Sequence, residues 1–146
     1  GHLMAPTFGS LKRGSEVVAP GKRLGDIGHA IQTFAEGEGF GVVRDFVGHG
    51  IGKKFHEEPQ VPHVGRPRTG PRLRPHMTFT IEPMINQGTW KLHILEDDWT
   101  AVTDDGGLSA QYEHTIAVTP DGFEIMTVQN DEGTWEPPGR QEIAVD

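Results

Sequence analysis

The chain has 146 residues, of which 34% are hydrophobic, and 13 Lys and Arg against 21 Asp and Glu give it a formal net charge of −8. This length suits one compact domain or one large part of a bigger domain, and the acidic balance argues against nucleic acid as a partner. The lack of cysteine excludes disulfides, thiolate zinc sites and cysteine nucleophiles, so any metal ion must be held by His, Asp and Glu.

Both ends of the chain lack a regular pattern. Residues 1–10 show no periodicity and are typical of a tag-like lead-in, and residues 129–146 predict a flexible, acidic tail. No apolar run approaches the roughly 18 residues of a membrane span, and no secretory leader opens the chain. We therefore expect one folded unit over residues 11–128, in a cytoplasmic protein without a membrane partner.

Two helices are predicted at the start of this unit. The pattern over residues 11–19 is short and compatible with a helix, and Pro20-Gly21 ends it. From Leu24 to Glu36, apolar residues recur at steps of three and four. This spacing predicts an amphipathic helix that ends at Gly37.

After Phe40 the hydrophobic period changes from about 3.6 to 2, which predicts strands. The expected strands are, in chain order, 42–47, 77–85, the hairpin pair 90–95 and 99–102, 111–118 and 122–128. The segment 57–75 is rich in proline and glycine and is expected to be a loop. Two helices followed by these strands indicate an α+β fold, with the helices packed on a mostly antiparallel sheet.

Two glutamates interrupt strands that are otherwise apolar. Glu82 lies in TFTIEPM and Glu113 in SAQYEHTIAV. Burying an unpaired carboxylate costs several kcal/mol unless a cation or hydrogen bonds compensate it. Two interpretations stay open: each glutamate faces solvent on a half-covered sheet, or a cation holds both.

His49 lies between two glycines, which leaves its ring open to a ligand, although a histidine in a surface turn has the same pattern. One imidazole and two carboxylates suit manganese, iron or cobalt, and also zinc. The segment that begins at His56 is not the helical zinc motif HExxH, because its fifth residue is Gln60.

Three motifs in order, VGHGIGKKFHEEPQVPH, MTFTIEPM and LSAQYEHTIAVT, closely resemble methionine aminopeptidases of the bacterial type. The resemblance runs from Leu11 to Thr127 and implies the carboxyl-terminal half of the pita-bread fold. Proline-specific relatives share similar metal ligands, but FHEEPQV with QYEHT fits the methionine enzymes better. The implied activity is metal-dependent removal of the initiator methionine from the N-terminus of a nascent polypeptide.

The resemblance also implies roles for single residues. His49, Glu82 and Glu113 match ligands of a two-metal site, in which Glu82 also passes a proton. His56 matches the histidine that contacts the scissile peptide. Four residues match positions around the methionine side-chain pocket: Phe55, Met84, Trp99 and Gln111.

The family has five metal ligands, and the two aspartates among them belong to strands that precede the matched region. We therefore expect about one divalent ion here, and an incomplete half that is inactive alone. The alternatives are an engineered or truncated stand-alone half-fold and a non-catalytic binding module. The expected partner is the missing amino-terminal half or a second copy, which would cover Phe79, Ile81 and Ile116.

The segment RPHM departs from the family, which usually has glycine in place of His76. A turn glycine often has a positive φ, which costs other residues about 1 kcal/mol or more. We therefore expect backbone strain at His76.

Overall fold

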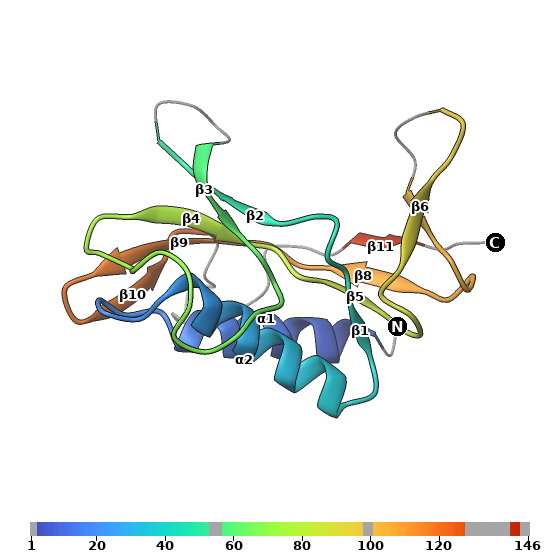
Figure 1. The fold of residues 1–146 in the computed structure, drawn as a ribbon, viewed down its shortest axis with the longest axis horizontal. Helices are drawn as coiled ribbons and strands as arrows, with labels where there is room; N and C mark the ends of the chain where they lie inside the picture. Colours follow the sequence, from blue (N-terminus) through green and yellow to red (C-terminus); the bar gives the residue numbers. More distant parts are fainter. Residues whose placement is uncertain (1–2, 53–56, 98–100, 128–140, 144–146) are drawn as a thin grey trace.

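The computed structural model describes residues 3–52, 57–97, 101–127 and 141–143, and shows two helices beneath a set of short strands (Figure 1). The helices are α1 (Met4–Glu16) and α2 (Leu24–Gly37). The strands are β1 (Gly41–Val42), β2 (Gly48–Gly50), β3 (Glu57–Val61), β4 (Thr78–Ile81), β5 (Met84–Asn86), β6 (Leu92–Ile94), β7 (Ala101–Thr103), β8 (Ser109–Gln111), β9 (His114–Thr119), β10 (Gly122–Ile125) and β11 (Gln141–Ile143).

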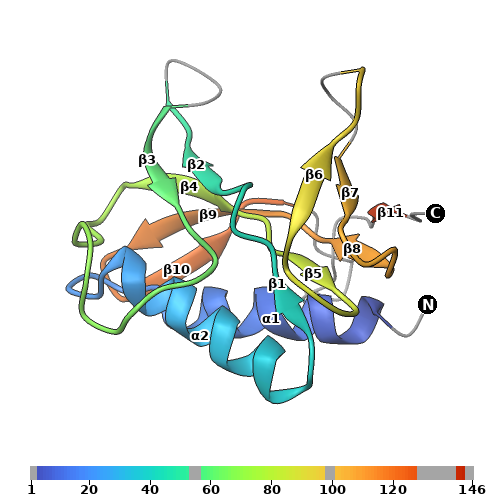
Figure 2. The ribbon, with the colours of Figure 1, turned by 45° about the vertical axis from the view of Figure 1, so that its right-hand side comes forward.

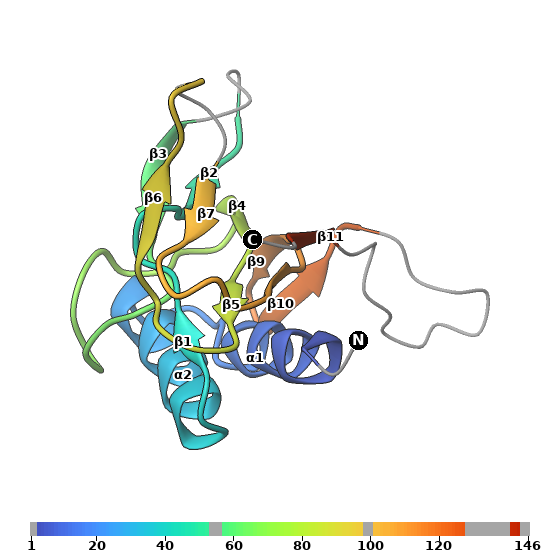
Figure 3. The same cartoon turned by 90° about the vertical axis from the view of Figure 1, so that its right-hand side faces the viewer.

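The strands form two sheets and a separate hairpin, and the pairings among them are antiparallel. One sheet has the order β10-β9-β4-β2-β3 and the other the order β1-β5-β8-β11, while β6 pairs with β7. The helices lie on one side of the sheets, and β3, β6 and β7 rise on the other side (Figures 2 and 3). The predicted α+β architecture, with helices on a mostly antiparallel sheet, is confirmed.

Helix α2 matches its prediction closely because one face is continuously apolar. Leu24, Ile27, Ile31 and Ala35 are buried in the core that α2 shares with α1 and the sheets. The Asp26 carboxylate accepts a hydrogen bond of 2.8 Å from the backbone N–H of Arg23, which is the N-terminal cap of this helix.

Helix α1 begins at Met4, so the predicted start near residue 11 is wrong, and residues 4–10 are helical rather than unpatterned. Polar residues on the buried face hid the helical period. The hydroxyls of Thr7, Ser10 and Ser15 donate to carbonyl oxygens four residues earlier, at 2.6, 2.9 and 2.8 Å. Because these hydrogen bonds satisfy the hydroxyls, the three side chains can be buried.

Three strand predictions need correction. Residues 57–61, expected in a loop, form β3, which pairs with β2. The single strand expected over 42–47 does not form: β1 ends at Val42, and β2 begins at Gly48. Within the tail expected to be flexible, residues 141–143 form β11 beside β8.

The hydrophobic core lies between the helices and the sheets. Phe79, Ile81 and Ile116 are each 0% exposed, and they belong to one cluster with Leu11 of α1 and Ile31 of α2. The expectation that these three sheet residues lack a cover is therefore wrong, because the chain's own helices cover them. No helix in the described part of the chain is long and apolar enough to cross a membrane.

Candidate metal centre

Two neighbouring strands are interrupted at matching points, and a glutamate lies at each interruption. Ile81 of β4 is paired with His114 of β9, and Met84 of β5 with Gln111 of β8. Between these pairs, Glu82-Pro83 faces Tyr112-Glu113, outside the regular strands. Proline lacks the N–H that a sheet ladder needs, so an interruption here is expected.

His49 comes from β2, on the other side of β4. Its backbone N–H donates a 3.0 Å hydrogen bond to the Thr80 hydroxyl. A Cβ on Gly48 would overlap the Thr80 carbonyl oxygen, and one on Gly50 would overlap that of Glu58. Glycine is therefore needed on both sides of His49, because the backbones of β4 and β3 approach closely. This is a second reason for the motif, besides the open ring that we expected.

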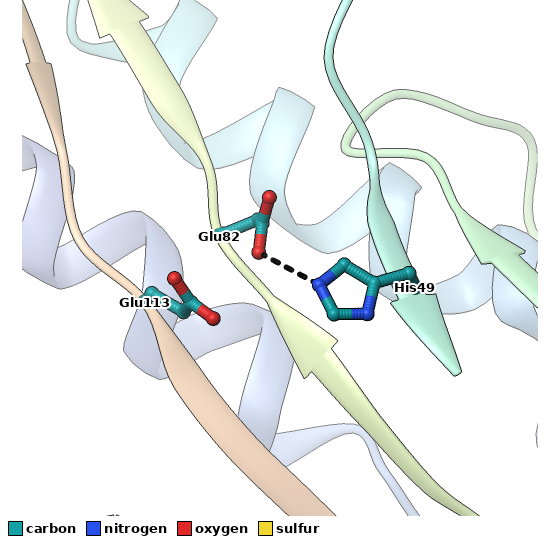
Figure 4. A group of neighbouring side chains, drawn as sticks. All are labelled: His49, Glu82 and Glu113. Carbon is teal, nitrogen blue, oxygen red and sulfur yellow. Dashed lines mark ion pairs between the residues drawn. The ribbon is translucent and has the colours of Figure 1, made fainter. Parts of the chain in front are cut away.

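The three side chains converge above the sheet (Figure 4). His49 Nε2 lies 3.7 Å from Glu82 Oε2, and Glu82 lies between His49 and Glu113. One potential ligand atom from each residue falls within 4.8 Å of the others. The side chains of His49 and Glu82 are 13% and 17% exposed, and Glu113 is more open. The donors are thus shielded on one side and accessible on the other.

Electrostatics at Glu82 fit a cation site. Burial and then the negative charge of Glu113 raise the pKa of the Glu82 carboxyl to about 7, although the Thr80 hydroxyl and His49 act in the opposite direction. Glu82 also hydrogen-bonds to Glu113. Two carboxylates held this close repel each other when both are ionised, and a divalent cation relieves that repulsion.

The His49 ring is oriented for ligation. Its Nδ1 lies 3.2 Å from the Gly50 carbonyl oxygen, which can only accept, so Nδ1–H donates there and Nε2 is the nitrogen directed toward Glu82. The imidazole and two carboxylates therefore fit a divalent metal ion.

Of the other predicted site residues, two lie beside Glu82. Met84 is buried in β5, opposite Gln111 of β8. The Gln111 Nε2 donates a 3.1 Å hydrogen bond to the Glu82 carbonyl oxygen. Phe55, His56 and Trp99 lie outside the described residues.

Two residues that contact this group were not expected from the sequence. Thr80 joins the His49 backbone to the Glu82 carboxylate. The Nε2 of His63 accepts a 3.0 Å hydrogen bond from the Glu82 backbone N–H. His63 stands alone in a segment rich in proline and glycine, and no spacing or periodicity there distinguishes it from a surface histidine.

The sequence and the fold both match known metallopeptidases. A family model described as metallopeptidase family M24 matches residues 4–120. Methionine aminopeptidase A of Synechocystis is 62% identical over 126 residues, which are 86% of this chain and 50% of that protein. The chain thus spans about half the length of such relatives.

Solved structures agree with this match. The crystal structure of methionine aminopeptidase from Rickettsia prowazekii is 51% identical with a TM-score of 0.83, over 85% of this chain and 50% of that one. Prolidase from Pyrococcus furiosus is 21% identical with a TM-score of 0.60, over 88% of this chain and 32% of that one, which shows a shared fold alone. The predicted resemblance and the half pita-bread fold are confirmed, and this chain belongs to metallopeptidase family M24.

Proposed function

We propose that this chain is the carboxyl-terminal half of a metal-dependent aminopeptidase that removes N-terminal methionine, and that His49, Glu82 and Glu113 hold a divalent ion in it. The observation that carries the proposal is the convergence of these three donors at the matching strand interruptions. The 62% identity to a methionine aminopeptidase supports methionine as the residue removed.

The side chains have complementary tasks in this proposal. When bound, a divalent cation supplies Lewis-acid polarisation of a peptide carbonyl and lowers the pKa of water. Besides acting as a ligand, Glu82 passes a proton in this proposal. By the family pattern, His56 would hydrogen-bond the scissile peptide, and the methionine side chain would be surrounded by Phe55, Met84, Trp99 and Gln111. Manganese, iron, cobalt and zinc all suit the donor set.

The remaining ligands and the activity depend, in this proposal, on a partner half. The chain spans only about half of its relatives, and three protein ligands suit one ion better than two. A second copy is the weaker candidate for the partner, because the sheet residues that argued for it are buried by α1 and α2.

Calorimetric titration with manganese tests the metal centre. About one equivalent should bind, and His49→Ala or Glu82→Gln should each weaken binding about tenfold or more. His93→Ala is a matched control, because His93 is exposed on β6 and pairs with Asp104 at 2.9 Å instead. Equal affinity in all four proteins would contradict the assignment of the ligands.

A fused chain tests the activity. The amino-terminal half of the Synechocystis relative, joined ahead of this chain, should release methionine from a methionyl peptide when manganese is present. The same fusion with Glu113→Gln should lose most of that release. A folded fusion that binds manganese but releases no methionine would overturn the proposed activity and leave the metal centre standing.

A further inference from the structure

Glu82 lies where its backbone cannot use the sheet ladder. It follows the last residue of β4 and precedes Pro83, so neither of its backbone polar groups belongs to a regular strand pair. Both groups are nevertheless satisfied by side chains. The N–H donates to His63 Nε2 at 3.0 Å, and the carbonyl oxygen accepts from Gln111 Nε2 at 3.1 Å. The peptide group that carries this carboxylate is thus held from two directions.

His63 is suited to be a permanent acceptor. It is 2% exposed, and Glu82 presents to its Nε2 a backbone N–H, which can only donate. Because Nε2 accepts the Glu82 N–H, the single ring proton resides on Nδ1. A lysine or arginine could not replace it, since neither has an acceptor atom.

The position of His63 in the chain links the two elements that carry donors. His63 lies two residues after β3, and β3 pairs with β2, where Gln60 is opposite His49. On its other side the ring holds Glu82, between β4 and β5. A displacement of β2 and β3 relative to β4 would therefore break this hydrogen bond.

We propose that His63 is a positioning residue, whose Nε2 fixes the Glu82 peptide group so that the carboxylate meets His49 at the metal centre. The inference rests on the proposed function, because it assigns a purpose to the orientation of Glu82. Partners that orient a ligand typically change metal affinity by about 10- to 100-fold when they are lost. No metal bond is assigned to His63 itself.

Two substitutions separate the hydrogen bond from the bulk of the ring. His63→Leu replaces the ring with an apolar side chain of moderate size that has no acceptor. We expect this substitution to weaken manganese binding in calorimetry about tenfold or more. In His63→Gln the amide oxygen replaces Nε2 as acceptor, and we expect affinity within about threefold of the unsubstituted chain.

Ile31→Ala is the control for a purely structural effect. Ile31 is fully buried in α2, and its truncation destabilises the fold through a cavity without touching Glu82. Titrations are made at a temperature where circular dichroism shows all variants folded. Ile31→Ala should bind manganese as the unsubstituted chain does, despite its lower melting temperature.

Amide hydrogen exchange of Glu82, without metal, provides a second measurement. The amide should be protected in the unsubstituted chain and in His63→Gln, and it should exchange at least about tenfold faster in His63→Leu at matched global stability. Weak binding and fast exchange confined to His63→Leu support the proposal. Unchanged affinity in His63→Leu would overturn it while the metal centre stands, and a complete lack of manganese binding in the unsubstituted chain would overturn both.

Discussion

Gly48 lies directly against the backbone of Thr80, so that a Cβ on Gly48 would overlap the Thr80 carbonyl oxygen. The obstacle is main chain, which cannot turn aside as a flexible side chain can. The adjacent residue, His49, donates its N–H to the Thr80 hydroxyl at 3.0 Å. The distance between β2 and β4 therefore decides how close the His49 ring comes to Glu82.

Gly48→Ala is expected to push β2 away from β4. The predicted loss of stability is about 1–3 kcal/mol, as for other overpacked sites, together with weaker manganese binding. Urea unfolding and calorimetry measure the two effects. Gly122→Ala is the control, because no atom lies within 4 Å of a Cβ there. Full stability in Gly48→Ala would mean that the strands move apart without cost.

His76→Gly is expected to stabilise the chain. His76 has φ of 75°, in the left-handed region that favours glycine, as the departure from the family pattern had predicted. Relief of this strain is worth about 1 kcal/mol, which raises the melting temperature by a few degrees. Differential scanning calorimetry measures it. Arg74→Gly, at an exposed neighbouring position without positive φ, should have the opposite effect.

The stability of the metal-free chain should depend on pH through the titration of Glu82. Its pKa rises from 4.5 to about 7 on folding, so between these pH values the folded chain holds a proton that the unfolded chain has released. The stability that the protonated Glu82 contributes is fully present below pH 4.5 and is lost as the pH rises through 7. Urea unfolding with a chelator should show the unsubstituted chain losing stability relative to Glu82→Gln over that range. A constant difference would contradict the raised pKa.

Two buried histidines should produce the opposite dependence. Burial lowers the pKa of His63 and of His114 to about 4, whereas the unfolded chain takes up protons on both near pH 6.5. The stability that the two neutral rings contribute is fully present above pH 6.5 and is lost as the pH falls toward 4. His114→Gln should reduce this acid destabilisation in urea unfolding, and adding His63→Gln should remove most of the rest. If the double variant loses as much stability at low pH as the unsubstituted chain, protonation of carboxylates accounts for the acid destabilisation.

The amphipathic helix α2 and the convergence of three motifs could be predicted from the sequence. The apolar positions of α2 repeat with the helical period, and each of the three donors stands out locally, either between glycines or inside an apolar strand. The family pattern then indicated that these donors share one site. The alternation of apolar and polar residues along each separate strand could not show this.

Other features depend on contacts that no local pattern records. The start of α1 was missed because Thr7, Ser10 and Ser15 satisfy their hydroxyls inside the helix. Strand β3 was missed because Glu57–Val61 contains two glutamates and a proline, and its pairing with β2 is what makes it a strand. His63 could not be found because its partner is a backbone N–H 19 residues away.

The matching interruptions also restrict how this chain can change length. Two residues separate the flanking pairs on each strand, so the register of β4 on β9 continues as that of β5 on β8. Deleting Pro83 alone would turn each β5 side chain to the opposite face, sending Ile85 outward from the core. Deleting Tyr112 as well would restore the pairing of β5 with β8, because each strand would then have lost one residue. Insertions and deletions at this point must therefore occur on both strands together if the register is to be kept.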